Sequence, residues 1–188
     1  MQTSEIRITN PDWVDKVVDL HATYPDDDAR IRVAIALARE NVVRGTGGPF
    51  GAAVFDAQSG KLVGVGTNGV LRLNNSSAHA EVIALMMAQA HVRNFTLQGN
   101  GTTHELFSSC EPCAMCLGAT LWSGVTRLVC SATREDATRL RFDEGPVFPE
   151  SYRYLAERGV AIERGRLRHE AVAVFDLYVE RGGPIYNR

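Results

Sequence analysis

Two short runs constrain this chain more than any other feature. Residues 79–81 read HAE, and residues 108–117 read SSCEPCAMCL, which holds three of the four cysteines. Imidazole nitrogen and thiolate sulfur are ligands of zinc, and a catalytic zinc keeps three protein ligands with a fourth position open to water. His79, Cys113 and Cys116 supply such a set, so the fold is expected to bring the two runs together around Zn²⁺.

The spacing of the two cysteines suits a metal site at the start of a helix. Cys113 and Cys116 are three residues apart, so both can lie on one face of a helix opened by Pro112. The free N–H groups and the dipole at a helix start favour negative charge, which favours the thiolate form that binds metal.

Glu81 follows the histidine by two residues. On a helix this spacing points His79 and Glu81 roughly 200° apart, so they can converge only in the first turn, with Ser77 as the expected N-cap. Zinc would lower the pKa of its bound water to about 7. Glu81, not itself a ligand, is expected to take the water's proton, pass it to a ring nitrogen and later protonate the departing group.

Two other readings of the cysteines stay open. A closed structural zinc site would use four ligands, namely His79, Cys110, Cys113 and Cys116. A C-x-x-C run can also be a redox pair. Two features argue against the structural site. Cys110 lies on the strand side of Pro112, and a carboxylate such as Glu81 is not expected beside a thiolate cluster without catalytic function. The catalytic site is therefore preferred, and Cys130 is read as a small buried hydrophobe.

Composition narrows the class of ligand. The 188 residues are 45% hydrophobic with a net charge of −2, typical of one soluble domain, residues 1–188, with its own core. Binding to long nucleic acid depends on cationic contacts to phosphate, so a small, weakly charged ligand fits better. No apolar run is long enough to cross a bilayer, and residues 1–5 do not resemble a signal peptide. With the cysteines clustered, we expect a cytoplasmic protein with no membrane or nucleic-acid partner.

Strand and helix patterns alternate after residue 50, which predicts an α/β layered domain with helices covering a sheet. The expected strands are residues 52–57, 61–67, 103–109, 126–132 and 160–163. The expected helices are residues 11–18 (capped by Asn10), 26–44, 78–92, 112–122, a short one near Glu135, 150–158 and 168–181. Asp26, Asp27 and Asp28 are read as a solvated helix start. The glycine-rich residues 45–51 form either a simple turn or a wall close to a ligand.

The two runs match the signature of zinc deaminases, H-x-E followed by P-C-x-x-C. The chain thus resembles the cytidine deaminase-like superfamily, and more narrowly its guanine deaminase branch. The further stretches that carry the resemblance are residues 47–51 (GGPFG), 66–68 (GTN), 78–81 (AHAE), 109–119 (SCEPCAMCLGA), 142–144 (FDE) and 185–188 (IYNR). They lie between residues 47 and 188, so residues 1–44 are read as an N-terminal helical extension.

The resemblance implies a three-layer α/β/α fold with a central five-stranded mixed sheet, usually as a homodimer. It implies His79, Cys113 and Cys116 as zinc ligands and Glu81 as proton shuttle. The residues it places at the substrate are Asn68 as a hydrogen-bonding group, Phe50 against the face of the base, Ala80, and Trp122 as part of the pocket.

The resemblance also implies roles for an acidic loop and for the tail. A second acidic residue would help to move protons, either Glu144 or, less favoured, Asp143; the alternative is a turn with solvated charges. Residues 182–188 would close over the substrate and give Tyr186 a stacking or hydrogen-bonding role. The alternative is a frayed terminus.

The signature fixes the chemistry and leaves the base open. The resemblance favours guanine, hydrolysed to xanthine and ammonia. The alternatives are cytosine, 5-azacytosine, isoguanine or an aminotriazine such as ammeline, guanosine and, less favoured, adenosine in tRNA. The rival from another class is a zinc-stabilised interaction module without catalysis.

Overall fold

A computed structural model describes residues 5–99 and 101–186 of the chain. Its centre is one five-stranded sheet in the order β2-β1-β3-β4-β5. The strands are β1 (Gly51–Asp56), β2 (Leu62–Thr67), β3 (His104–Cys110), β4 (Arg127–Ala132) and β5 (Ala161–Glu163). Strand β1 pairs antiparallel with both β2 and β3, whereas β3, β4 and β5 run parallel. The sheet is therefore mixed, as expected.

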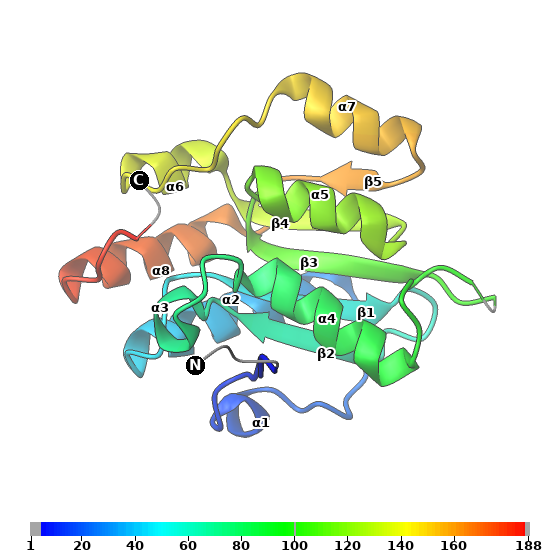
Figure 1. The fold of residues 1–188 in the computed structure, drawn as a ribbon, viewed down its shortest axis with the longest axis horizontal. Coiled ribbons are helices and arrows are strands. Elements are labelled where there is room, and N and C mark those ends of the chain that lie inside the picture. Colours follow the sequence, from blue (N-terminus) through cyan, green and yellow to red (C-terminus); the bar gives the residue numbers. More distant parts are fainter. Residues whose placement is uncertain (1–4, 100, 187–188) are drawn as a thin grey trace.

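Helices connect the strands and cover the sheet (Figure 1). They are α1 (Val14–Val17), α2 (Asp27–Val43), α3 (Val70–Leu73), α4 (Ala80–Val92), α5 (Ala114–Ser123), α6 (Arg134–Arg139), α7 (Pro149–Glu157) and α8 (Arg168–Glu180). Parallel neighbours need a crossover connection, which α5 supplies between β3 and β4, and α6 and α7 between β4 and β5. Among the residues described, none of these helices has both the length and the apolar character to span a bilayer.

Alternating side chains of the strands pack into two hydrophobic cores, one on each face of the sheet. Ala53 and Phe55 of β1 join the core formed with α2 and α8, whereas Ala52 and Val54 join the core formed with α4 and α5. This is the two-residue period of a strand that is buried on both sides. The arrangement confirms the predicted α/β/α layers, and Figure 1 shows α4 and α5 side by side over one face.

Close packing of α4 on β2 fixes where α4 begins. A Cβ atom on Gly66 would lie 2.1 Å from the backbone oxygen of Ala80, so only glycine lets the helix approach this closely. The first turn of α4 is therefore held directly over the end of β2, and this contact places His79 at the edge of the sheet.

Three predicted helix starts are wrong. Helix α4 begins at Ala80 with His79 as N-cap, not Ser77, and α5 begins at Ala114 with Cys113 as N-cap, not Pro112. Asn10 does not cap α1, because its side chain donates to the Val65 oxygen at 2.8 Å and accepts from Thr67 N on β2. At Asn10 the contacts with β2 override the local capping preference. Helix α3 was not predicted.

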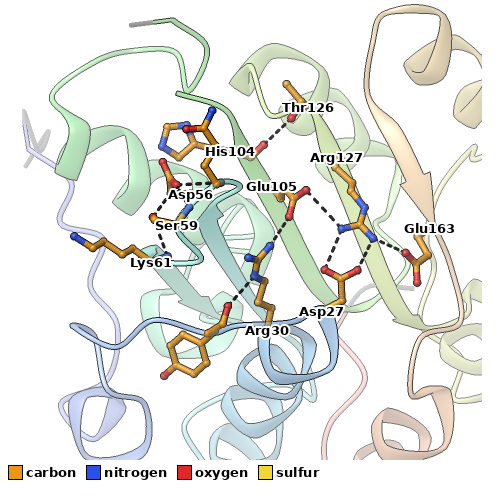
Figure 2. Close-up of polar contacts among 12 residues, drawn as sticks. Asp27, Arg30, Asp56, Ser59, Lys61, His104, Glu105, Thr126, Arg127 and Glu163 are labelled. Atoms are coloured by element: carbon orange, nitrogen blue, oxygen red, sulfur yellow. Dashed lines mark hydrogen bonds and ion pairs between the residues drawn. The ribbon is translucent and has the colours of Figure 1, made fainter. Parts of the chain in front are cut away.

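The acidic start of α2 is tied to the sheet by ion pairs, and is less solvated than predicted. Asp27 forms a two-pronged contact with Arg127 of β4, at 3.1 and 2.6 Å, and the same guanidinium reaches Glu163 at 2.5 Å and Glu105 at 3.5 Å. Arg30 donates to the other oxygen of Glu105 at 2.9 Å. Figure 2 shows this charge cluster at the end of the sheet where β3 and β4 begin.

Replacing Arg127 by methionine is predicted to destabilise the fold. Three carboxylates lose their shared cation, and the expected loss in unfolding free energy is about 1–3 kcal/mol at pH 7. The hydrogen bond from Arg127 lowers the pKa of Asp27 in the folded state, so its contribution is present at neutral pH and is lost as the pH falls below about 4. Urea unfolding at pH 7 and at a pH of about 2–3 measures this, and the difference between variant and wild type should shrink at the acidic pH.

The control is Arg32→Met. Arg32 pairs with Glu170 on the surface, with both side chains about half exposed, so its loss should change the unfolding free energy by less than about 1 kcal/mol. Equal losses in the two variants would contradict the role given to this partly buried cluster.

Candidate active site

The predicted site residues converge on a small cavity at the edge where β2, β3 and β4 end and β1 begins. The cavity has a volume of about 20 Å³. It is lined by Phe50, Asn68, His79, Glu81, Glu111, Cys113, Phe142, Glu144 and Tyr186. The carboxyl ends of parallel strands and the starts of the helices that follow them are the usual place for sites in α/β proteins.

The three predicted zinc ligands lie together. The ligand atoms of His79, Cys113 and Cys116 all fall within 4.8 Å of one another. Nδ1 of His79 lies 3.4 Å from Sγ of Cys113 and 3.5 Å from Sγ of Cys116. Two helix starts meet here, since His79 and Cys113 are the N-caps of α4 and α5.

The electrostatics of the cluster make one of the two thiols acidic. A hydrogen bond from Cys116 lowers the pKa of the Cys113 thiol to about 4, against the opposing effect of burial, and His79 adds to the lowering. The same hydrogen bond, together with burial, raises the pKa of the Cys116 thiol well above its usual value. One imidazole nitrogen, two sulfurs and an adjacent open cavity form the donor set of a catalytic zinc site. The residues present therefore fit Zn²⁺, with room beside it for water.

Glu81 is buried directly beside the cluster. Its Oε1 accepts a hydrogen bond from Ser108 Oγ at 3.2 Å, and its Oε2 lies 3.5 Å from Sγ of Cys116. Burial raises the pKa of this carboxyl group, and the Cys113 thiolate adds to the effect. A carboxyl group with a raised pKa beside a metal site is well suited to proton transfer.

Cys110 and Cys130 stand apart from the cluster. Sγ of Cys110 lies 3.7 Å from the backbone oxygen of Thr133, and Cys130 is fully buried in the core under α4 and α5. Burial raises the pKa of both thiols well above the usual value. Cys110 therefore makes no fourth ligand, and the closed structural site is not formed.

Asn68 and Phe50 form one wall of the cavity. Oδ1 of Asn68 accepts from the Val70 N–H at 3.3 Å, which leaves its amide N–H groups for a ligand. The ring of Phe50 packs edge-to-face against Phe142, with ring centres 5.1 Å apart. This wall combines a flat apolar surface with an oriented polar group, as a site for a heteroaromatic ring requires.

The acidic loop places one of its two carboxyl groups in the cavity. Glu144 is buried, and this burial, followed by the charges of Cys113 and Glu81, raises its pKa to about 8. Asp143 is exposed and accepts from the Gly145 N–H at 2.8 Å, which makes it part of the turn. Glu144 thus takes the position expected of a second proton-transfer group, and Asp143 does not reach the cavity.

Tyr186 of the tail packs against the cavity from the C-terminal side. Its ring centre lies 5.2 Å from that of Phe142, and its buried hydroxyl has no hydrogen-bond partner among the residues described. Tyr178 Oη donates to the Pro184 oxygen at 2.6 Å and fixes the segment before it. The last two residues of the predicted tail, Asn187 and Arg188, lie outside the described residues.

Besides Asp143, two predicted substrate contacts are not among the lining residues. Trp122 is 80% exposed at the end of α5, so the prediction that it lines the pocket is wrong for a single chain. Ala80 is fully buried against β2, so its side chain does not face the cavity; a contact through its backbone stays a prediction.

Two lining residues were missed from the sequence. Phe142 lies in the quoted FDE stretch, and its aromatic type beside an acidic residue was the available signal. Glu111 is 5% exposed, accepts from Arg134 N at 3.1 Å and pairs with Arg164 at 3.4 Å. The sequence feature that could have identified Glu111 is its place between Cys110 and Pro112, inside the run that holds the metal ligands.

This site agrees with the comparison to known families. Residues 25–132 match the cytidine and deoxycytidylate deaminase zinc-binding region. The chain belongs to this family. The match includes α2, so the helix that was read as an extension lies within the family region.

Similar proteins are known at the level of both sequence and structure. A guanine deaminase of Bacillus subtilis is 35% identical over 130 residues, which is 69% of this chain and 80% of that protein. A solved guanine deaminase from Nitrosomonas europaea is 36% identical, with a TM-score of 0.89 over 97% of this chain and 99% of its own. A solved complex with 2,6-diaminopurine is 39% identical, with a TM-score of 0.89 over 96% of each chain.

Replacing Cys113 by serine is predicted to remove most of the bound zinc, because it takes away one of three ligands. Cys110→Ser is the matched control, since Cys110 is equally buried in the same run and lies outside the cluster. Metal analysis of the purified variants measures the zinc per chain. Loss of zinc from Cys110→Ser to the same degree would favour a four-ligand structural site instead.

Proposed function

We propose that the protein is a zinc-dependent guanine deaminase that hydrolyses guanine to xanthine and ammonia. The observation that carries the proposal is one cavity in which the metal cluster meets Glu81, Glu144, Asn68 and an aromatic wall. The similarity to two guanine deaminases and to a purine complex supports guanine as the base.

Different residues of the cavity carry out different steps of the proposed reaction. Zinc, when held by His79, Cys113 and Cys116, supplies a Lewis acid that makes water a nucleophile near neutral pH. Glu81 takes a proton from the water that attacks C2 of guanine and delivers it to N3 of the ring. The C2 hydroxyl then gives up its proton, the amino group takes one, and the C2–N bond breaks, so that ammonia leaves and the C2 carbonyl of xanthine forms. We assign Glu144 to proton transfer on the side of the amino group. Water and guanine are consumed, and xanthine and ammonia are formed.

The wall orients the base for this attack. The free amide N–H groups of Asn68 can donate to an acceptor on the ring edge, while Phe50 and Phe142 exclude water from its faces. A cavity of about 20 Å³ holds about one water molecule, not a purine. We therefore infer that Tyr186 and its segment move to admit the base and return over it.

A panel of bases tests the proposal with zinc-loaded protein and ammonia release as the readout. The panel is guanine, isoguanine, cytosine, 5-azacytosine, ammeline, guanosine and adenosine. Guanine is expected to give the highest kcat/KM. A better substrate among the others would replace guanine, and bound zinc with no ammonia from any of them would favour the non-catalytic interaction module.

Glu81→Gln is predicted to keep zinc and to lower kcat by about 10²–10⁴-fold, because it removes the group that transfers the proton. Zinc content and steady-state kinetics on guanine measure the two effects. Ser108→Ala, which removes only the hydrogen bond to Glu81, should reduce kcat far less. A Glu81→Gln variant with near-normal kcat would contradict the assignment.

Truncation after Arg181 is predicted to raise KM for guanine by about tenfold or more, because it removes Tyr186 from the cavity wall. Tyr186→Phe keeps the ring and should have a smaller effect. Unchanged KM and kcat in the truncated chain would show that the segment is a mere tail.

We further propose a homodimer that pairs through the face of α4 and α5. Four apolar side chains on or next to these helices are exposed: Met86 (46%), Phe95 (86%), Met115 (39%) and Trp122 (80%). Exposed apolar side chains on neighbouring helices support an interaction surface there.

Trp122→Ser combined with Phe95→Ser is predicted to shift the protein from dimer to monomer in light scattering after size exclusion. The control is Val179→Ser, an exposed apolar position on α8 at the other side of the sheet. A wild-type monomer, or a dimer unaffected by the double substitution, would contradict the assigned face.

We place the protein in the cytoplasm. All four cysteines are free thiols, which fits a reducing compartment. Fractionation of cells that express the full chain tests this, and recovery outside the cytoplasm would contradict it.

A further inference from the structure

A buried asparagine on α2, outside the cavity, connects two of its walls. Asn41 is fully buried near the end of the helix. Its Nδ2 donates two hydrogen bonds of 2.9 Å, one to the backbone oxygen of Gly48 and one to the backbone oxygen of Asn68. Its Oδ1 accepts from Thr46 Oγ1 at 2.7 Å. The side chain therefore holds two segments that lie 7 and 27 residues away along the chain.

The hydrogen bond from Asn41 to the carbonyl oxygen of Asn68 fixes the backbone of Asn68. The N–H of Asn68 donates to the Phe50 oxygen at 3.0 Å, its carbonyl oxygen accepts from Asn41, and its side-chain Oδ1 accepts from the Val70 N–H. Only the amide N–H groups of Asn68 remain for a ligand. Because Asn41 supplies the carbonyl's side-chain partner, it helps to set where those N–H groups point.

The hydrogen bond from Asn41 to the Gly48 oxygen fixes the backbone against which Tyr186 packs. This backbone is the seat of Tyr186. A Cβ atom on Gly48 would lie 1.8 Å from the hydroxyl oxygen of Tyr186, so the tyrosine sits directly against the backbone of Gly48. The carbonyl of this same residue accepts from Asn41. Asn41 thus ties the seat of the tail residue to the segment that carries Asn68.

Gly47 shows how closely these groups are packed. A Cβ atom there would lie 2.0 Å from the Asn68 oxygen and 2.6 Å from Nδ2 of Asn41. The bond between Asn41 and Asn68 therefore requires glycine at this position. Trp13 Nε1 donates to Thr46 Oγ1 at 3.2 Å and so extends the network to the N-terminal segment.

We infer that Asn41 is a positioning residue for base binding, which holds the backbone of Asn68 in a fixed position relative to the backbone of Gly48 that forms the seat of Tyr186. The inference rests on the proposed function. Asn41 touches neither the metal cluster nor Glu81, so its loss should weaken base binding and spare the proton chemistry. A side chain that only stabilised the fold would lower stability without this selectivity.

The test compares Asn41→Asp with wild type. The carboxylate keeps an acceptor for Thr46 but has no N–H for Gly48 and Asn68. Zinc content, melting temperature, kcat and KM for guanine are measured, together with the Kd for 8-azaguanine, an analogue bound in a similar solved structure. We expect KM and Kd to rise about tenfold or more, kcat to stay within about threefold, and zinc to be retained.

Val33→Ala is the matched control, because Val33 is buried on the same helix and lines neither wall. It should lower the melting temperature and leave KM and Kd unchanged. If Asn41→Asp does not fold, Thr46→Val replaces it in the test. This variant removes the hydrogen bond that Thr46 donates to Oδ1 of Asn41, and it should also raise KM and Kd, by a smaller factor.

Two results would overturn the inference. One is an unchanged KM and Kd in folded Asn41→Asp or Thr46→Val, and the other is an equal rise in Val33→Ala. Failure of the proposed function looks different, because wild type itself would then release no ammonia from guanine. In that case the same comparison is made with whichever base of the panel wild type binds.

Discussion

The site depends on two ligands that occupy N-cap positions. His79 and Cys113 have extended backbone dihedrals, with ψ near 154° and 172°, and each begins a helix that packs on the same face of the sheet. Because both residues precede the first helical turn, their side chains lie at the helix ends that meet at the metal cluster. This explains how residues two apart, His79 and Glu81, can serve the same centre. It also brings the positive ends of two helices to the sulfur atoms of Cys113 and Cys116.

Helix α2 couples the two ends of the sheet. Its first residue, Asp27, is held by Arg127 at the end where β3 and β4 begin, as Figure 2 shows, and Asn41 near its other end bonds to the cavity wall. The charge cluster fixes the helix along its axis, since Arg127 also contacts Glu105 and Glu163 on neighbouring strands. The position of Asn41, and with it that of Asn68, therefore depends on a helix anchored far from the chemistry.

The sequence predicted the chemical centre better than its surroundings. Metal ligands and Glu81 are specified by residue type and spacing, so they could be read directly, and the alternation of strands and helices gave the layers. Ser77 has the better intrinsic capping side chain, yet contact between Gly66 and Ala80 moves the helix start to His79. The bonds of Asn41 join segments distant in sequence, and no local pattern announces them. The family resemblance placed Trp122 in the pocket, whereas its side chain is 80% exposed at the end of α5.

The hydroxyl of Tyr186 requires a hydrogen-bond partner from the ligand. It is buried without a partner among the described residues, and an unsatisfied buried hydroxyl costs about 1–3 kcal/mol. A base that supplies a hydrogen-bond partner on that edge removes this cost, whereas a ring without one keeps it. The N–H groups of Asn68 make the complementary demand, because their Oδ1 is already engaged by Val70 and only an acceptor satisfies them. A guanine ring, with oxygen and nitrogen acceptors on its edges, can meet both demands. The hydroxyl of Tyr186 and the amide of Asn68 thus require a ligand with hydrogen-bonding groups on its edges, which a purely apolar ring does not provide.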